Sequence, residues 1–124
     1  MEYSKETFIA LVGASNNPEK YGYKIFKDLL AFGYDIVGVN PKGEDILDQK
    51  IYQSLSEISK KPGLVIIVVP PSVGVSILKE CVELGLNNVW MQPGAESSEA
   101  IEYAATKGLN LEVNKCFMLK QGIW

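Results

Sequence analysis

The stretch FIALVGASNNPEKYG, residues 8–22, decides the fold of this chain. Phe8–Val12 is a short apolar run that leads into Gly13, and an amphipathic segment follows the loop. A strand, a glycine turn and a helix in this order open a dinucleotide-binding Rossmann unit. The pattern G-x-G-x-x-G is incomplete, because Ser15 stands where the second glycine is expected. The stretch therefore predicts a nucleotide-binding turn whose phosphate loop departs from the usual form.

Further apolar runs along the chain have the continuous Val, Ile and Leu character of strands buried on both faces of a parallel sheet. With the first, they make five predicted strands, at residues 8–12, 35–39, 64–69, 88–91 and 110–113. Amphipathic helices are predicted between them, at residues 22–32, 72–84 and 96–107, each followed by a glycine. Residues 43–59 are less regular, with a possible helical turn in YQSLSEI. The alternation predicts an α/β fold: one Rossmann-like, doubly wound domain over residues 1–124, with a five-stranded, mainly parallel sheet.

Composition narrows the classes of function. The net charge of −3 gives no general attraction to nucleic acid or to an anionic membrane. No apolar run approaches the roughly 18 residues of a membrane span, so we expect a cytoplasmic protein. The chain contains no histidine, which removes Ser-His and Cys-His dyads, a phosphohistidine and His-ligated metals. Lys, Asp and Glu remain available for acid–base chemistry, but the composition favours binding over catalysis, and no metal site is predicted.

The loop after the first strand is the first candidate site, since ligands of such sheets lie beyond the carboxyl ends of the strands. Gly13 permits a tight turn, and the N–H groups behind it, near a helix N-terminus, can hold a phosphate. The alternative is an ordinary loop in which Asn17 caps the helix and Pro18 takes its first position. The candidate residues are Gly13, Ala14, Ser15, Pro18, Lys20 and Tyr21.

The end of the second strand reads VGVNPKG and supplies Asn40, Pro41 and Lys42. A protein that binds NAD places an acidic residue here to hold the ribose 2′-hydroxyl. The lysine in its place argues for a nucleotide with an extra ribose phosphate, either NADP or coenzyme A (CoA). A plain turn with Pro41 at its second position is compatible with that function.

The ends of the third and fourth strands add further candidates. In VVPPSVG, the residues Val69, Pro70 and Pro71 offer a rigid apolar wall for an adenine or a pantetheine arm. Pro71 is also expected to start the next helix, and Val73 is assigned to the buried stripe of that helix. In WMQPGAESSE, the candidates are Gln92, with a side-chain amide, Pro93 and Gly94.

VGASNNPEKYGYKI, VGVNPK, VVPPSVG, WMQPGAESSE and VNKCFML occur in this order. Together they resemble the small single-domain CoA-binding proteins, which are related to the N-terminal CoA-binding domain of the succinyl-CoA synthetase α subunit. The resemblance covers about residues 7–120. The synthetase carries a second domain with a phosphohistidine, which is missing from this chain. The resemblance therefore implies CoA binding without thioester synthesis by that mechanism.

The resemblance also implies a role for each motif. The loop 13–21 would hold the CoA phosphates, with Ser15 and Lys20 as side-chain contacts. Asn40 and Lys42 would lie beside the adenosine, Lys42 near the 3′-phosphate. Residues 69–71 would flank the adenine and the upper pantetheine, and residues 92–94 would approach the lower arm.

Several functions stay open at this stage. The leading one is a module that binds CoA or an acyl-CoA as a non-catalytic carrier, sensor or regulatory partner. The alternatives are an NADP-linked oxidoreductase or redox sensor, and an interaction subunit that no longer binds a ligand. Cys116, next to Lys115, is a candidate redox thiol that could form a mixed disulfide with CoA, or else a small buried hydrophobe. A homodimer or an unidentified protein partner is plausible.

Overall fold

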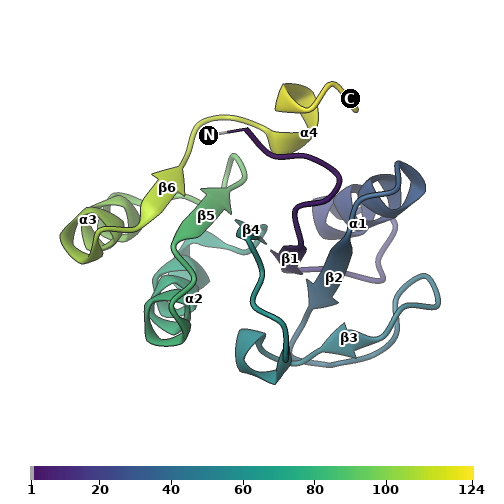
Figure 1. Ribbon diagram of the computed structural model, residues 1–124, viewed down its shortest axis with the longest axis horizontal. Coiled ribbons are helices and arrows are strands. Elements are labelled where there is room, and N and C mark those ends of the chain that lie inside the picture. The colour runs from purple at the N-terminus through teal and green to yellow at the C-terminus, as the bar shows by residue number, and fades with distance from the viewer. Residues whose placement is uncertain (1) are drawn as a thin grey trace.

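The computed structural model describes residues 2–124 as strands and helices in alternation (Figure 1). The elements are β1 (Ile9–Val12), α1 (Tyr21–Ala31), β2 (Ile36–Val39), β3 (Ile51–Tyr52), a 3₁₀ turn (Leu55–Glu57), β4 (Leu64–Ile67), α2 (Pro71–Leu84), β5 (Asn88–Met91), α3 (Ser98–Lys107), β6 (Asn110–Glu112) and α4 (Phe117–Lys120). The predicted α/β class and the Rossmann-like fold are confirmed.

The strands of residues 2–124 form one parallel sheet in the order β3-β2-β1-β4-β5-β6. This is a doubly wound order, and it reverses between β1 and β4. The sheet has six strands rather than the predicted five. The additional strand, β3, is only Ile51–Tyr52, paired with Gly38 and Val39 of β2. Two residues are too short to produce an apolar run, so the segment 43–59 gave no strand signal.

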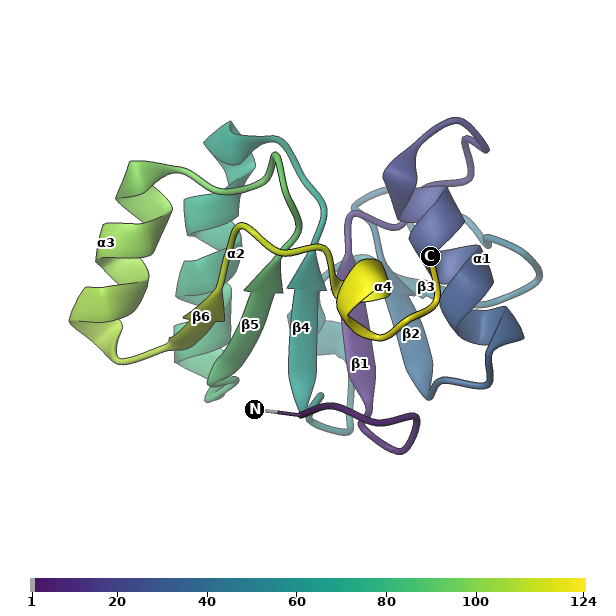
Figure 2. The same ribbon diagram turned by 90° about the horizontal axis from the view of Figure 1, so that it is seen from above.

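Both faces of the sheet are covered by helices (Figure 2). Alternate side chains of β1 separate into two cores: Ile9 and Leu11 pack with α1 and α4, and Ala10 and Val12 pack with α2 and α3. The central strands β1 and β4 are therefore buried on both sides, which explains their continuous apolar sequence.

Two helix details differ from the sequence predictions. Helix α1 begins at Tyr21 with Lys20 at its N-cap, so Asn17 is not the helix cap. The Asn17 side-chain oxygen instead accepts the N–H of Glu19 at 3.0 Å within the loop, and its carbonyl accepts the N–H of Lys20. Val73, assigned to the buried stripe of α2, is 40% exposed. The first turn of α2 extends beyond the ends of the strands (Figure 2).

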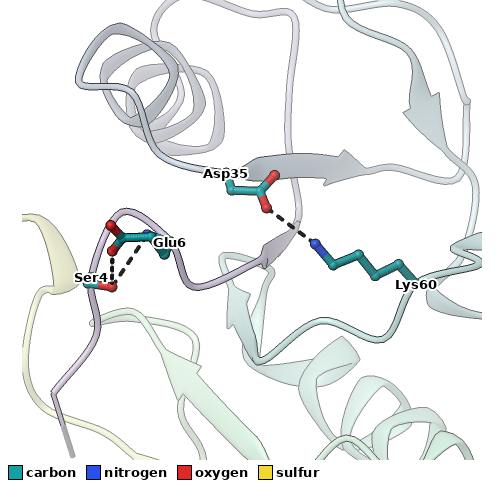
Figure 3. A network of polar contacts seen from close by, with 4 residues as sticks. All are labelled: Ser4, Glu6, Asp35 and Lys60. Atoms are coloured by element: carbon teal, nitrogen blue, oxygen red, sulfur yellow. Dashed lines mark hydrogen bonds and ion pairs between the residues drawn. The ribbon is translucent and has the colours of Figure 1, made fainter.

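Polar contacts mark the amino-terminal edge of the sheet (Figure 3). Lys60 forms an ion pair with Asp35 at 3.5 Å, and the Ser4 hydroxyl donates to Glu6 at 2.8 Å, which lowers the pKa of that carboxyl. These residues precede β4, β2 and β1, so they lie at the opposite edge from the candidate site. Among residues 2–124, no helix has the length and apolarity to cross a bilayer, and no cluster of three potential metal ligands occurs.

Candidate functional site

A cleft of about 620 Å³ opens at the carboxyl ends of the strands, over the point where the strand order reverses. Its walls come from the segments that follow β1, β2, β4 and β5. In Figure 2, α1 and α2 flank this edge from opposite faces of the sheet. The cleft therefore occupies the position at which ligands of doubly wound sheets bind.

The β1–α1 loop depends on two glycines for its close packing. Gly13 has φ of +103°, and a Cβ atom there would collide with the carbonyl oxygen of Val68. A Cβ atom on Gly22 would in turn collide with the carbonyl oxygen of Gly13. The loop, the end of β4 and the first turn of α1 are thus in backbone contact. Gly22 permits the close packing of helix and strand that is expected of the third glycine in the fingerprint, although the second glycine is absent.

Several backbone N–H groups around this loop have no hydrogen-bond acceptor among residues 2–124. The N–H groups of Ser15, Tyr21 and Gly22 have no acceptor within residues 2–124, and all three residues line the cleft. Lys20, exposed beside them, has no ion-pair partner in the same part of the chain. Free N–H groups at a helix N-terminus together with an unpaired ammonium make an anion-binding arrangement.

Asn40 fixes the geometry between two loops. Its side-chain N–H donates to the carbonyl of Ala14 at 2.7 Å, and its side-chain oxygen accepts the N–H of Lys42 at 2.8 Å. Both ends of the amide are therefore used within the protein, and Asn40 holds the β1–α1 loop against the turn that follows β2. Pro41 lines the cleft, and its carbonyl accepts from Gln53 at 3.1 Å. Lys42 is exposed and lies outside the cleft lining.

The far wall of the cleft is apolar. Val69 and Pro70 line it with the exposed side chain of Val73, whereas Pro71 is the first residue of α2 and does not line it. On the neighbouring turn, the Gly94 N–H is held by the Glu96 carboxylate at 3.1 and 3.2 Å.

Gln92 is a buried polar side chain at the end of β5, with an exposed fraction of 5%. Its side-chain oxygen accepts the N–H of Phe117 at 2.7 Å, and its amide nitrogen donates to the Cys116 sulfur at 3.4 Å. The first of these bonds joins the end of β5 to the start of α4. Gln92 therefore joins the elements at this end of the site, and it also lines the cleft.

A second cavity of about 300 Å³ adjoins the cleft under the C-terminal segment. Its lining is almost wholly apolar and comes from Tyr21, Ile25, Val68, Gln92, Pro93, Cys116, Leu119 and Trp124. The Trp124 ring lies 6.1 Å from that of Tyr21, and its indole N–H donates to Asp28 at 2.7 Å. These contacts hold the end of the chain against α1.

The predicted site residues separate into three groups. Those that line the cleft are Gly13, Ala14, Ser15, Lys20, Tyr21, Asn40, Pro41, Val69, Pro70, Gln92, Pro93 and Gly94. Cys116 lines the second cavity, and Pro18, Lys42 and Pro71 line neither.

The candidate residues named from the sequence did not include the lining residues Glu19, Gly22, Ile25, Val68, Val73, Ala95, Leu119 and Trp124. The position of Val68 directly after a central strand was a usable signal. Leu119 and Trp124 gave none, because only the folding back of α4 brings them to this edge.

The fold and the site together define a Rossmann-like domain with a glycine turn and a cleft at the switch point of its sheet. Residues 7–121 match the family of CoA-binding domains, and the chain belongs to that family. The resemblance predicted from the ordered motifs is thus confirmed.

Among curated proteins, the chain is 42% identical over 82 residues to the α subunit of the ADP-forming acetate–CoA ligase II of Pyrococcus furiosus. That match covers 65% of the chain and 18% of the ligase subunit. The ADP-forming acetate–CoA ligase of Methanocaldococcus jannaschii is 37% identical over 78 residues, which are 63% of the chain and 11% of the ligase. The chain thus spans less than a fifth of these relatives.

Solved structures of similar length also match. A conserved hypothetical protein from Pyrococcus furiosus has a TM-score of 0.88 and 43% identity, over 92% of this chain and 98% of its own. A hypothetical protein from Pyrococcus horikoshii has a TM-score of 0.85 and 34% identity, over 94% of this chain and 82% of its own. The domain therefore occurs in proteins not much longer than this chain as well as within ligases.

Proposed function

We propose that the protein binds CoA or an acyl-CoA in the 620 Å³ cleft, with the phosphates at the β1–α1 loop. The observation that carries the proposal is the set of free N–H groups on Ser15, Tyr21 and Gly22, in a chain that belongs to the CoA-binding domain family. A pyrophosphate supplies the acceptors that these donors lack, and Lys20 supplies a balancing charge.

The remaining parts of CoA are assigned by the chemistry of the walls. The apolar surface of Val69 and Pro70 suits the adenine and the upper pantetheine. Gln92, Pro93 and Gly94 line the other end, where the lower pantetheine arm would lie. Lys42, exposed next to Pro41, would reach the 3′-phosphate from the rim of the cleft rather than from its wall.

We assign the domain a binding role, as a carrier or regulatory module, rather than catalysis. Its curated relatives include ADP-forming acetate–CoA ligases, but the chain matches less than a fifth of them. The 124 residues contain no histidine, so they supply no phosphohistidine of their own. A cytoplasmic location and a homodimer remain predictions.

The alternatives to plain CoA binding concern NADP and the thiol of Cys116. Family membership favours CoA over NADP as the nucleotide with the extra ribose phosphate. Cys116 remains a proposed redox thiol: its sulfur lines the cavity next to Gln92, so attack of its thiolate on CoA disulfide would form a mixed disulfide and release one CoA thiol. Intact mass after exposure to CoA disulfide tests this step, and an unmodified mass contradicts it.

Thermal unfolding with CoA, dephospho-CoA, NADP and NAD at equal concentrations tests the main proposal. A ligand at 100 times its dissociation constant stabilises the fold by about 2.7 kcal/mol, which raises the midpoint by several degrees. We expect the largest rise with CoA, a smaller one with dephospho-CoA and none with NAD. A rise with NADP alone would transfer the protein to the oxidoreductase class, and no rise with any ligand would refute nucleotide binding.

The role of Lys42 has a separate test. Lys42→Ala should weaken CoA to the affinity of dephospho-CoA and leave dephospho-CoA unchanged. An equal loss for both ligands would place Lys42 elsewhere on the nucleotide.

A further inference from the structure

The 300 Å³ cavity under α4 has a chemistry that the phosphate loop does not share. Its side chains are Ile25, Val68, Pro93, Leu119 and the rings of Tyr21 and Trp124, with Gln92 and Cys116 as the polar exceptions. Nearly all of the surface turned toward the cavity is hydrocarbon, aromatic ring or sulfur. Such a lining favours an apolar ligand over water.

The cavity adjoins the cleft. Tyr21, Val68, Gln92 and Pro93 line both spaces, so these residues lie between the cleft and the cavity. With its phosphates at the β1–α1 loop, CoA would bring its thiol end toward Gln92 and Pro93. The group attached to the thiol would then stand at the mouth of the cavity.

We propose that this cavity is an acyl-chain pocket, and that the preferred ligand is an acyl-CoA with an aliphatic chain of medium length. The inference rests on the proposed CoA site. An apolar cavity of about 150 Å³ is enough to bind benzene. A space of about 300 Å³ therefore accommodates an aliphatic chain of six carbons.

Gln92 supplies a polar contact at the point where a thioester would lie. One N–H of its side-chain amide points to the Cys116 sulfur at 3.4 Å, and the other has no acceptor within residues 2–124. A thioester carbonyl is an acceptor that free CoA lacks. The same side chain is held by the N–H of Phe117, so its orientation is fixed before the ligand arrives.

Titration calorimetry of the full chain with CoA, acetyl-CoA, butyryl-CoA, hexanoyl-CoA and decanoyl-CoA tests the pocket. Burial of one methylene contributes about 0.8 kcal/mol, which is about a fourfold change in the dissociation constant. We expect the affinity to rise about fourfold per methylene from acetyl to hexanoyl and to level off by decanoyl. The plateau distinguishes a pocket of limited volume from adsorption to an apolar surface, for which affinity would continue to rise.

Variants of the wall show whether the gain arises in this cavity. Cys116→Phe fills it and should abolish the dependence on chain length. Cys116→Ser keeps the volume and is the matched control, which should retain the dependence. Should Cys116→Phe fail to fold, Trp124→Ala gives the same test by removal of the outer wall, and it should reduce the gain per methylene.

The possible failures can be told apart. Binding of CoA with equal affinity for every acyl-CoA would overturn the acyl pocket and leave the proposed function intact. No binding of CoA or of any acyl-CoA would overturn the proposed function itself. A chain-length dependence that survives in both Cys116→Phe and Trp124→Ala would place the acyl group outside this cavity.

Discussion

The two ends of the cleft are built in opposite ways. At the β1–α1 loop, the N–H groups of Ser15, Tyr21 and Gly22 have no acceptor within residues 2–124, and the Lys20 ammonium is exposed. At the β5 end, Gln92 is buried and bonded to Phe117 and Cys116. The first end thus presents unpaired backbone donors and an exposed ammonium, whereas internal hydrogen bonds join the elements around an apolar space at the second. Under the proposed CoA binding, Lys20 would contribute to affinity without an internal ion pair among residues 2–124, whereas Gln92 contributes hydrogen bonds within the fold.

The largest expected effect, on the free energy of unfolding, comes from the backbone packing of the β1–α1 loop. Gly13→Ala combines a strained φ with a collision at the Val68 carbonyl, and we expect a loss of about 2 to 5 kcal/mol in the free energy of unfolding. Gly33→Ala is the control, because Gly33 has φ of +80° but no atom within 4 Å of the added Cβ. Its cost should be about 1 kcal/mol, from strain alone. Urea unfolding measures both, and equal losses would mean that close packing does not constrain the loop.

The next prediction separates the affinity for CoA from the stability of the fold at the β1–α1 end of the cleft. Lys20→Ala should weaken CoA about 10- to 100-fold, since a hydrogen bond to a charged group contributes about 1.5 to 3 kcal/mol. Lys20 lacks an ion-pair partner among the described residues, so the free energy of unfolding should change by less than about 0.5 kcal/mol. Lys27→Ala, on an exposed part of α1, is the matched control and should alter neither quantity. Calorimetry and urea unfolding read the two quantities, and a loss of stability without loss of affinity would contradict the assignment.

At the β5 end of the cleft, we expect a substitution of Gln92 to lower the stability of the fold. Gln92→Leu keeps most of the side-chain volume but leaves the buried N–H of Phe117 without its acceptor, which costs about 1 to 3 kcal/mol. Gln53→Leu removes an amide of the same type that is exposed and bonded to Pro41, so it should change stability by less than about 0.5 kcal/mol. A denaturant midpoint equal for the two variants would show that the Gln92 bond contributes little.

The difference between the two ends of the cleft also explains which parts of the fold and the site could be predicted from the sequence. The strand ends and Gly13 were predictable because a parallel sheet buried on both faces needs continuous apolar runs, and the turn after β1 needs a glycine at positive φ. The β5 end of the cleft was predictable only in part. Gln92 was found as the residue after an apolar run, but its bond to Phe117 spans 25 positions and depends on the path of α4. Leu119 and Trp124 enter the site by tertiary folding, which no local pattern encodes.

The smallest expected effect extends the comparison to the two cysteines, of which Cys116 lines the apolar cavity and Cys81 is fully buried in α2. Burial raises the pKa of the Cys81 thiol from 9.0 to about 12, with a further contribution from Glu80. Because the folded state holds the neutral thiol, its contribution to stability is fully present below pH 9 and is lost as the pH rises toward 12. Cys81→Ala should therefore make the urea midpoint fall less steeply between pH 9 and pH 10.5 than it does in the parent chain.

Tyr3→Phe provides the internal standard for that measurement, because partial burial and Glu112 raise the pKa of Tyr3 in the same direction. Tyr3→Phe should reduce the fall of the urea midpoint at alkaline pH less than Cys81→Ala does, since the Tyr3 hydroxyl is only partly withdrawn from water.

Alkylation with iodoacetamide at pH 8 compares the two cysteines directly. Cys116 should react in the folded protein and be protected by hexanoyl-CoA, whereas Cys81 should react only after unfolding. If Cys81 is alkylated as fast as Cys116, then α2 opens locally in the folded protein. The reagent would in that case reach Cys81 through α2 as well as Cys116 through the apolar cavity.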